Sequence, residues 1–422
     1  MELKTKSIKG MTLALLMLIA AMAGCIGTED ETTEEAEETK PAFLDASDAG
    51  YTYASDVDNH RSLMQDLCDI KTAASDSNWD EAKNIYTNGK NAEKSDGSFR
   101  TLAGFAAASG KNHNYDTFYG QDGAIGAHIM AAMDGTGDFA GASDTVRYQG
   151  IAKLTANMGM VGYTIHELNA AVAKADAGNT DNDSGAPHNW DEGWAFFHGP
   201  DEHWSCSPAY TMKKRAADYG TETNGVSNAL AASEQAMVDG LAALQAGDKA
   251  GYDAATETVI KNIIITYSQA TLKYTMKMDN NESAAKYQAE GYAFWKTMEA
   301  YAAPYTDGCY NMAVHKVFMM GDIDASACDA FIWTNGSMDA NGTKDTCYNT
   351  VTHQVSTDVS NETECDGYAA IYFQDMYGAQ KINEIVNLSD ASKHGTSYDV
   401  APHLAMVWAH YGITEADIGT YQ

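Results

Sequence analysis

The sequence is poor in proline and in basic side chains. Only six prolines occur in 422 residues, and none lies between Pro208 and Pro304. This favours long helices, because proline interrupts the helical hydrogen-bond pattern. The chain has 27 Lys and Arg against 59 Asp and Glu, a formal net charge of −32. A surface of that sign repels nucleic acid and attracts cations, so we expect no nucleic-acid partner.

Several catalytic and metal-binding motifs are also missing. The sequence has no CxxC pair, no HExxH, no GxSxG, no GxxxxGK[ST] loop and no DxDxDG calcium loop. A cysteine zinc site, a serine-hydrolase elbow and a phosphate-binding loop are therefore not indicated. We expect a protein without catalytic activity, and the alternative is a secreted metal-dependent hydrolase.

The first 24 residues predict a secretory signal peptide. Lysines in MELKTKSIKG precede the apolar run MTLALLMLIAAMAG, which is shorter than the roughly 20 residues of a membrane span. AMAGC then resembles a lipobox, which makes Cys25 the lipid-bearing residue. Residues 25–45 hold the acidic stretch TEDETTEEAEETKP and predict a solvated tether. We expect an extracytoplasmic protein anchored to the membrane by lipid; the alternative is an ordinary signal peptide with an incidental cysteine.

Residues 46–422 are expected to form one helical domain. Apolar residues recur at helical spacing, and no series of alternating strands is evident. The prediction is an all-α helical bundle with an internal repeat. Predicted helices span 59–74, 79–88, 98–109, 144–174, 191–198, 206–219, 226–246, 250–278, 283–302, 309–319, 367–387 and 400–410.

Cysteine usage predicts disulfides. Six cysteines besides Cys25 lie in a chain expected outside the cytoplasm, which allows up to three bridges. The last four favour local pairing and predict a disulfide-stapled loop region at 321–366, near the C-terminus. The sequence leaves the pairing open among Cys68, Cys206, Cys309, Cys328, Cys347 and Cys365.

One short motif occurs twice, as EGWAF at 192–196 and EGYAF at 290–294. The two copies are interpreted as matching core helices. Glu290 is predicted to lie inside a helix beside an apolar face, where a buried carboxylate needs a base, a donor network or a metal. In a pseudo-symmetric bundle, Glu192 and Glu290 could face each other across the core, an arrangement in which bundles hold metals.

Histidines and acids are dense between residues 162 and 203. GYTIHELNAA contributes His166 and Glu167, and PHNWDEGWAFFHGPDEHW contributes Glu192 and His198. Imidazoles with carboxylates are usual ligands of iron, zinc or manganese. The alternative is a chance concentration of acids and histidines in an acidic chain.

His188 has the i, i+4 spacing to Glu192 that would place both on one helical face. Pro187 and an expected helix cap at Asn189 argue against a helical His188. His188 is therefore left out of the predicted ligand set.

A basic cluster, Lys213, Lys214 and Arg215, stands out in so acidic a chain. One interpretation is an anion site at Lys214 and Arg215, for carbonate or a ligand carboxylate. The other is a solvated helix face with acidic neighbours.

The chain resembles the iron-assimilating periplasmic proteins of green algae, which are also known as high-CO2-inducible or low-iron-inducible periplasmic proteins. The resemblance runs in order from about residue 58 to 305. It is carried by NWDEAKNIYTNGKN…SFRTLAGFA (78–106), YTIHELNAA (163–171), DEGWAFFHG (191–199), YTMKKRAADYG (210–220), ITYSQATLKYTMKM (265–278) and EGYAFWKTMEAY (290–301).

The resemblance implies a mainly helical, extracytoplasmic protein that assists iron uptake beside a membrane reductase or permease. Together with the motifs, it leads us to expect ferric or ferrous iron, with or without a carbonate anion. The predicted metal ligands are Glu192, Glu290, His166, Glu167 and His198. A structural surface protein without a site is a further alternative.

Overall fold

The computed structural model describes residues 48–108, 114–306 and 377–422 throughout, and parts of 308–376. The predicted signal peptide, Cys25 and the tether lie outside the described residues. The described residues fall within one unit, Ala42–Gln422. Within them, no helix is both long and apolar enough to cross a membrane.

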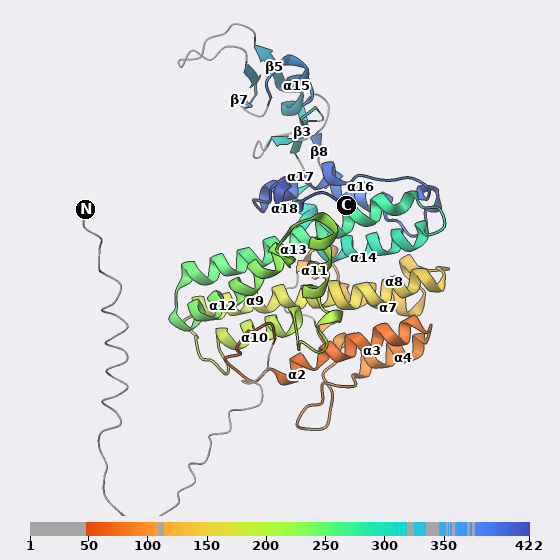
Figure 1. Ribbon diagram of the computed structural model, residues 1–422, viewed down its shortest axis with the longest axis vertical. Coiled ribbons are helices and arrows are strands. Elements are labelled where there is room, and N and C mark those ends of the chain that lie inside the picture. Colours follow the sequence, from red (N-terminus) through yellow and green to blue (C-terminus); the bar gives the residue numbers. More distant parts are fainter. Residues whose placement is uncertain are drawn as a thin grey trace, which may run out of the picture. The chain divides into compact units, whose positions relative to one another are not determined.

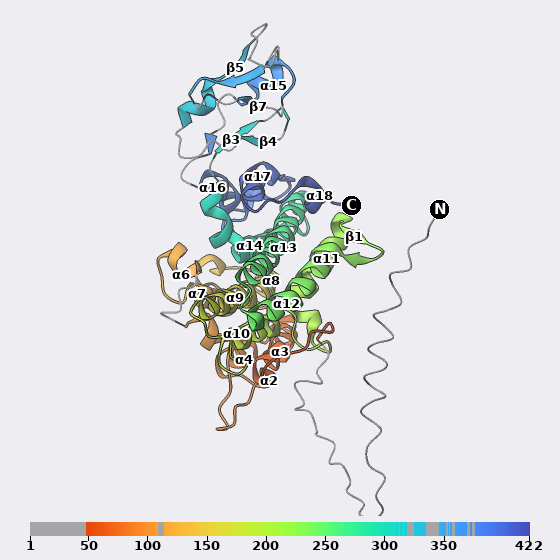
Figure 2. The same ribbon diagram turned by 90° about the vertical axis from the view of Figure 1, so that its left-hand side faces the viewer.

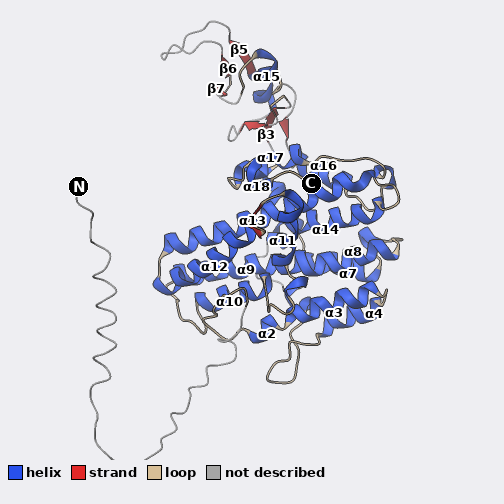
Figure 3. Cartoon of the chain, viewed as in Figure 1, coloured by secondary structure: helices blue, strands red, loops and turns tan. Residues whose placement is uncertain are grey.

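Helices make up most of the described chain, which confirms the predicted helical fold (Figures 1 and 3). They are α2 (Asp58–Arg61), α3 (Leu63–Ser75), α4 (Trp79–Asn88), α5 (Leu102–Ala106), α6 (Asn114–Tyr119), α7 (Ala124–Asp134), α8 (Asp144–Lys153), α9 (Met160–Asp176), α10 (Ala186–Phe197), α11 (Pro208–Tyr219), α12 (Asn228–Ala246), α13 (Lys249–Met276), α14 (Ala284–Ala302), α15 (Glu362–Asp366), α16 (Tyr377–Ile385), α17 (Ala401–His410) and α18 (Glu415–Ile418).

Helix ends follow local chemistry. Asn78 caps α4 by accepting a hydrogen bond from the Glu81 amide at 3.3 Å. Gly247 ends α12 with a left-handed backbone, φ 69°. The second Asn-Trp-Asp-Glu sequence behaves differently, because α10 already begins at Ala186 with Pro187 in its first turn. Proline is well tolerated there, where its missing N–H would have no helical partner.

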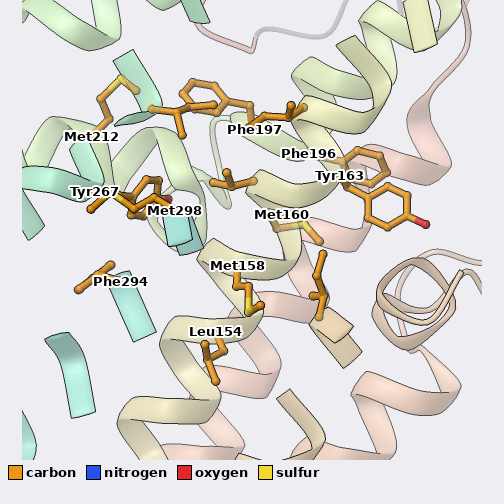
Figure 4. Close-up of a cluster of buried hydrophobic side chains, with 14 of the residues drawn as sticks. Leu154, Met158, Met160, Tyr163, Phe196, Phe197, Met212, Tyr267, Phe294 and Met298 are labelled. Carbon is orange, nitrogen blue, oxygen red and sulfur yellow. The ribbon is translucent and has the colours of Figure 1, made fainter. Parts of the chain in front are cut away.

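The predicted helix 144–174 is one rod with a π-helical segment, η3 (Leu154–Gly159), between α8 and α9. Helices α9 and α10 pack side by side, as do α12 with α13 and α13 with α14 (Figure 2). Their inner faces bury a large apolar core. Figure 4 shows part of it, from Tyr163 and Phe196 at one end to Leu154 and Phe294 at the other.

Strands are short and antiparallel. Apart from the hairpin β1 (Glu222–Thr223) and β2 (Val226–Ser227), the described strands lie between Gly308 and Phe373. One sheet has the order β4 (Lys316–Phe318), β3 (Gly308–Asn311), β8 (Tyr372–Phe373), and the other has the order β5 (Phe331–Thr334), β6 (Thr346–Asn349), β7 (Val355–Ser356).

Two predictions for this region are wrong in detail. The predicted helix 309–319 contains strands β3 and β4, and the predicted helix 367–387 begins only at Tyr377. Cross-strand pairing and two disulfides override helical propensity here. Part of the predicted loop 321–366 likewise pairs as β5, β6 and β7 around its own small core.

The described residues contain three disulfides. Cys309–Cys328 and Cys347–Cys365 are the local bridges predicted near the C-terminus. Cys68–Cys206 closes 138 residues of sequence and joins α3 to the turn η4 (Trp204–Cys206), just before α11. This third bridge therefore ties two distant parts of the helical bundle together.

Candidate metal-binding cluster

Helix α10 presents His188 and Glu192 on one face. The His188 Nε2 atom lies 3.2 Å from Glu192 Oε1 at i, i+4 spacing. His188 was wrongly excluded from the predicted ligands, because Pro187 lies within the first turn of α10 and does not precede the helix.

A second imidazole reaches the same carboxylate oxygen from α2. His60 Nε2 lies 3.1 Å from Glu192 Oε1, and only 4% of His60 is exposed. Its ring packs edge-on against Phe196, with 5.6 Å between centroids. His60 was missed by the sequence analysis, because no local motif marks it and only the folded chain brings it to α10.

Helix α9 adds a second carboxylate. The Asn189 amide group donates to Glu167 Oε2 and, at 3.4 Å, to Glu192 Oε2. Glu167 is also among the groups that lower the pKa of Glu192. His166 Nε2 lies farther out, 4.0 Å from Glu167 Oε1. We call His60, Glu167, His188 and Glu192 the histidine–glutamate cluster.

A second layer of polar groups orients His188. Ser55 Oγ lies 2.9 Å from His188 Nδ1 and donates to Asp191 Oδ2 at 2.9 Å. Asp191 also accepts from Tyr51 OH at 2.7 Å and from the amides of Ala54 and Ser55 at 2.8 Å. Such outer hydrogen bonds fix the ring orientation of a metal-binding histidine.

The cluster holds a charged carboxylate beside one neutral and one basic imidazole. Burial opposes ionisation of Glu192, but the hydrogen bond from His188 and the nearness of His60 lower its pKa. The same hydrogen bond raises the pKa of His188. Burial lowers the pKa of His60 to about 4, so His60 is neutral at neutral pH. Neutral imidazole and ionised carboxylate are the forms that bind metals.

The other predicted ligands lie elsewhere. His198 is buried with its ring stacked between Trp194 and Trp204, at centroid distances of 5.1 and 5.4 Å. Its Nδ1 lies 2.7 Å from the Gly199 carbonyl oxygen. His198 therefore has the surroundings of a packing residue.

Glu290 does not share the surroundings of Glu192. It is 6% exposed on α14, and the charges acting on it are those of Lys153, Lys286, Arg215 and Lys273. Helix α14 packs chiefly on α13 and α8, whereas α10 packs chiefly on α9 and α12. The structure thus brings Glu192, Glu167 and His166 close together, and it places Glu290 among basic side chains.

Lys214 and Arg215, the predicted anion-binding residues, lie in the same region as the basic side chains around Glu290. Both line a cavity of about 80 Å³ together with Lys71 and Lys153. Along the α8–η3–α9 rod, Lys153 precedes Glu167 by 14 positions, which corresponds to about 20 Å. The basic cavity and the histidine–glutamate cluster are therefore separate places in the fold.

The side chains of the cluster are of the types that bind transition metals, and they are hydrogen-bonded to one another. In the part of the chain that the structure describes, no three His, Cys, Asp or Glu side chains surround one point as ligands. Metal–ligand bonds of about 2.1 Å place neighbouring ligand atoms of an octahedron about 3.0 Å apart. The two Nε2–Oε1 distances of 3.1 and 3.2 Å are close to that spacing.

Comparison with known proteins identifies the family. The family model described as low iron-inducible periplasmic protein matches residues 30–307. No curated protein and no solved structure matches the chain. The match covers the cluster and the basic cavity, and it ends before the disulfide-stapled sheets. It confirms the resemblance seen in the sequence and agrees with an iron-related role outside the cytoplasm. The chain belongs to the low iron-inducible periplasmic protein family.

Proposed function

We propose that the protein binds iron outside the cytoplasm at the histidine–glutamate cluster and passes it to a membrane transporter. The supporting observation is the convergence of His60 Nε2 and His188 Nε2 on one oxygen of Glu192. Loss of the bridging protons and rearrangement of the side chains would let one ion replace these hydrogen bonds. Glu167 would supply a fourth ligand from α9.

The chemistry of the donors favours ferrous iron. Two imidazoles with carboxylates are typical of non-haem Fe(II), and ferric iron prefers harder, all-oxygen donor sets. Ferric iron remains the alternative within the same proposal. A carbonate held by Lys214 and Arg215 would lie too far from the cluster to bridge to this iron.

The remaining parts of the proposal concern delivery. A lipid at Cys25 would hold the protein at the cell membrane, where a reductase or permease takes up the iron. A binding role, without catalysis, fits the missing catalytic motifs. The acidic chain, with net charge −32, would raise the local concentration of cations near the site.

The test is an anaerobic titration of the purified chain with ferrous iron, repeated in air with chelated ferric iron, with and without bicarbonate. We expect one equivalent of ferrous iron to bind. Glu192→Gln and the double variant His60→Gln, His188→Gln should each lose affinity by at least about 100-fold, because a charged ligand or two imidazoles are removed.

Glu290→Gln is the matched control. It makes the same chemical change at a similarly buried glutamate that has basic neighbours. It should keep iron affinity within about twofold. Absence of iron binding in the wild type, or equal binding by a folded Glu192→Gln variant, would refute the cluster as the iron site.

A further inference from the structure

Four basic side chains line one small cavity, although basic residues are scarce in this chain. Lys71 comes from α3, Lys153 from the end of α8, and Lys214 and Arg215 from α11. The chain has only 27 Lys and Arg among 422 residues. Like charges held together repel, so this arrangement is unfavourable unless an anion accompanies it.

Arg215 is the central group. It is 5% exposed, and its Nη2 pairs with Asp218 Oδ2 at 2.9 Å. The guanidinium lies over the rings of Tyr274 and Phe294, at 5.4 and 5.9 Å from their centroids. Its Nε and Nη1 are buried and have no hydrogen-bond partner among the described residues. Arg215 lines the cavity, and a buried guanidinium with unsatisfied donors favours a nearby ligand with acceptor oxygens.

Positive charge is in excess around the cavity. The four basic side chains have two carboxylates near them, Glu290 and Asp218, so positive charges outnumber negative ones by at least two. Asp218 is also shared with Lys273, at 2.7 Å. A ligand with two negative charges would offset most of this excess.

The cavity wall is built with unusual backbone. The π-helical segment η3 begins directly after Lys153, and such segments are frequent at functional sites. Its Asn157 is fixed on both sides: Nδ2 donates to the Lys153 carbonyl oxygen at 2.8 Å, and Oδ1 accepts from Thr211 and Tyr267 at 3.0 and 2.9 Å. Ser207, the N-cap of α11, also lines the cavity, so the positive end of that helix dipole lies at its wall.

We propose that this cavity is a binding site for a small tetrahedral dianion of the phosphate or sulfate type, separate from the iron cluster. The volume of about 80 Å³ suits one such ion and is far below the roughly 300 Å³ or more of sites for larger organic ligands. The inference does not depend on iron binding, since no residue of the histidine–glutamate cluster lines the cavity.

The test is calorimetric titration of the full chain with phosphate and with sulfate in a chloride buffer, and with bicarbonate as a separate arm. We expect phosphate and sulfate to bind with one site. Arg215→Gln should weaken binding by at least about tenfold, because it removes the charged fork that recognises the oxygens. Lys214→Gln, at an exposed side chain whose loss does not threaten the fold, should weaken it by about three- to fivefold.

Lys213→Gln is the matched control. Lys213 belongs to the same basic cluster in sequence, but its Nζ lies over the Trp204 ring and it does not line the cavity. It should change affinity by less than about twofold. Glu290→Gln should strengthen binding, because it removes a carboxylate that competes for Lys153 and Arg215. Absence of phosphate and sulfate binding in the wild type, binding of bicarbonate alone, or equal weakening by Lys213→Gln and Lys214→Gln would overturn the proposal.

Discussion

The two copies of the Glu-Gly-aromatic-Ala-Phe motif lie in opposite chemical surroundings. Both are helical and well packed, on α10 and α14. Glu192 receives two imidazoles and a second glutamate, while Glu290 lies among lysines and an arginine. Burial is the largest influence on the pKa of each glutamate, and in both cases it acts to raise the pKa. Hydrogen bonds reverse that effect at Glu192 and lower its pKa, whereas the pKa of Glu290 stays raised.

This difference separates what the motif determines by itself from what the rest of the fold determines. In both copies, the aromatic and small residues of the motif form a helix with one buried face. The glutamates differ in the partners that other helices bring to them: α2 and α9 supply those of Glu192, in addition to His188 of its own helix. Helices α8, α11 and α13 supply those of Glu290, in addition to Lys286 of its own helix. One motif can therefore belong to the proposed cation site in one place and stand beside the proposed anion site in another.

Removal of the Cys68–Cys206 disulfide should produce the largest difference between the basic cavity and the histidine–glutamate cluster. Leu67 and Lys71 of α3, together with Cys206, Ser205 and Ser207, line the basic cavity. The double variant Cys68→Ser, Cys206→Ser should weaken sulfate binding about tenfold, because Lys71 is no longer held against α11. It should also lower the free energy of unfolding by about 2–4 kcal/mol. Calorimetry and denaturant unfolding measure the two effects.

The same variant should keep ferrous iron affinity within about twofold, because the histidine–glutamate cluster is built by α2, α9 and α10. The matched control is Cys309→Ser, Cys328→Ser, which opens a bridge in the C-terminal sheets and should leave both ligands bound. Equal loss of iron and sulfate binding would show that the two sites are not independent.

The next largest difference should lie in how much each glutamate contributes to the free energy of unfolding. Glu192→Gln leaves His60 and His188 without their charged acceptor, so the free energy of unfolding should fall by about 1–3 kcal/mol. Glu290→Gln replaces a carboxylate whose Oε2 has no partner among the described residues, so the change should be below about 1 kcal/mol. Urea unfolding of both variants, without added metal or oxyanion, tests this. An equal fall for both would mean that Glu290 is as well satisfied as Glu192.

The sequence predicted the helical fold, because long stretches with apolar residues at helical spacing and few prolines admit little else. It also predicted the local disulfides near the C-terminus. It failed where structure depends on distant partners: strands β3 and β4 form within a predicted helix because β8 and a disulfide hold them.

The candidate sites were only partly accessible to sequence reasoning. Glu192, Glu167 and His166 lie together as dense motifs suggested, and Lys214 and Arg215 do line one cavity. His188 was rejected by a misplaced helix start that Pro187 in a first turn could have corrected. The other residues that the sequence analysis did not predict have no local sequence signature. His60 reaches Glu192 from 132 positions away in sequence, and Lys71 and Lys153 meet α11 only in the folded bundle.

The smallest expected effect is a dependence of sulfate affinity on pH, which would further separate the anion site from the cluster. The pKa of Lys153 is lowered to about 8, chiefly by burial; Glu290 opposes this shift, and the nearby basic groups add to it. Lys153 is therefore charged below that pH and loses its proton as the pH rises through it. The charged or titratable groups that face it are Glu290 of α14, Lys71 of α3, Lys214 and Arg215 of α11, and Tyr274 of α13.

Sulfate keeps its two charges throughout this range, so a change in its affinity reports on the protein. Affinity should fall about three- to fivefold as the pH rises through about 8, because binding must then first return a proton to Lys153. Lys153→Met should bind sulfate more weakly and with little pH dependence over the same range. Calorimetric titrations of both proteins in buffers of equal ionic strength measure the difference. A wild-type affinity that is flat across this pH, or a slope that persists in Lys153→Met, would remove Lys153 from the anion site and leave Arg215 and Lys214 as its charged groups.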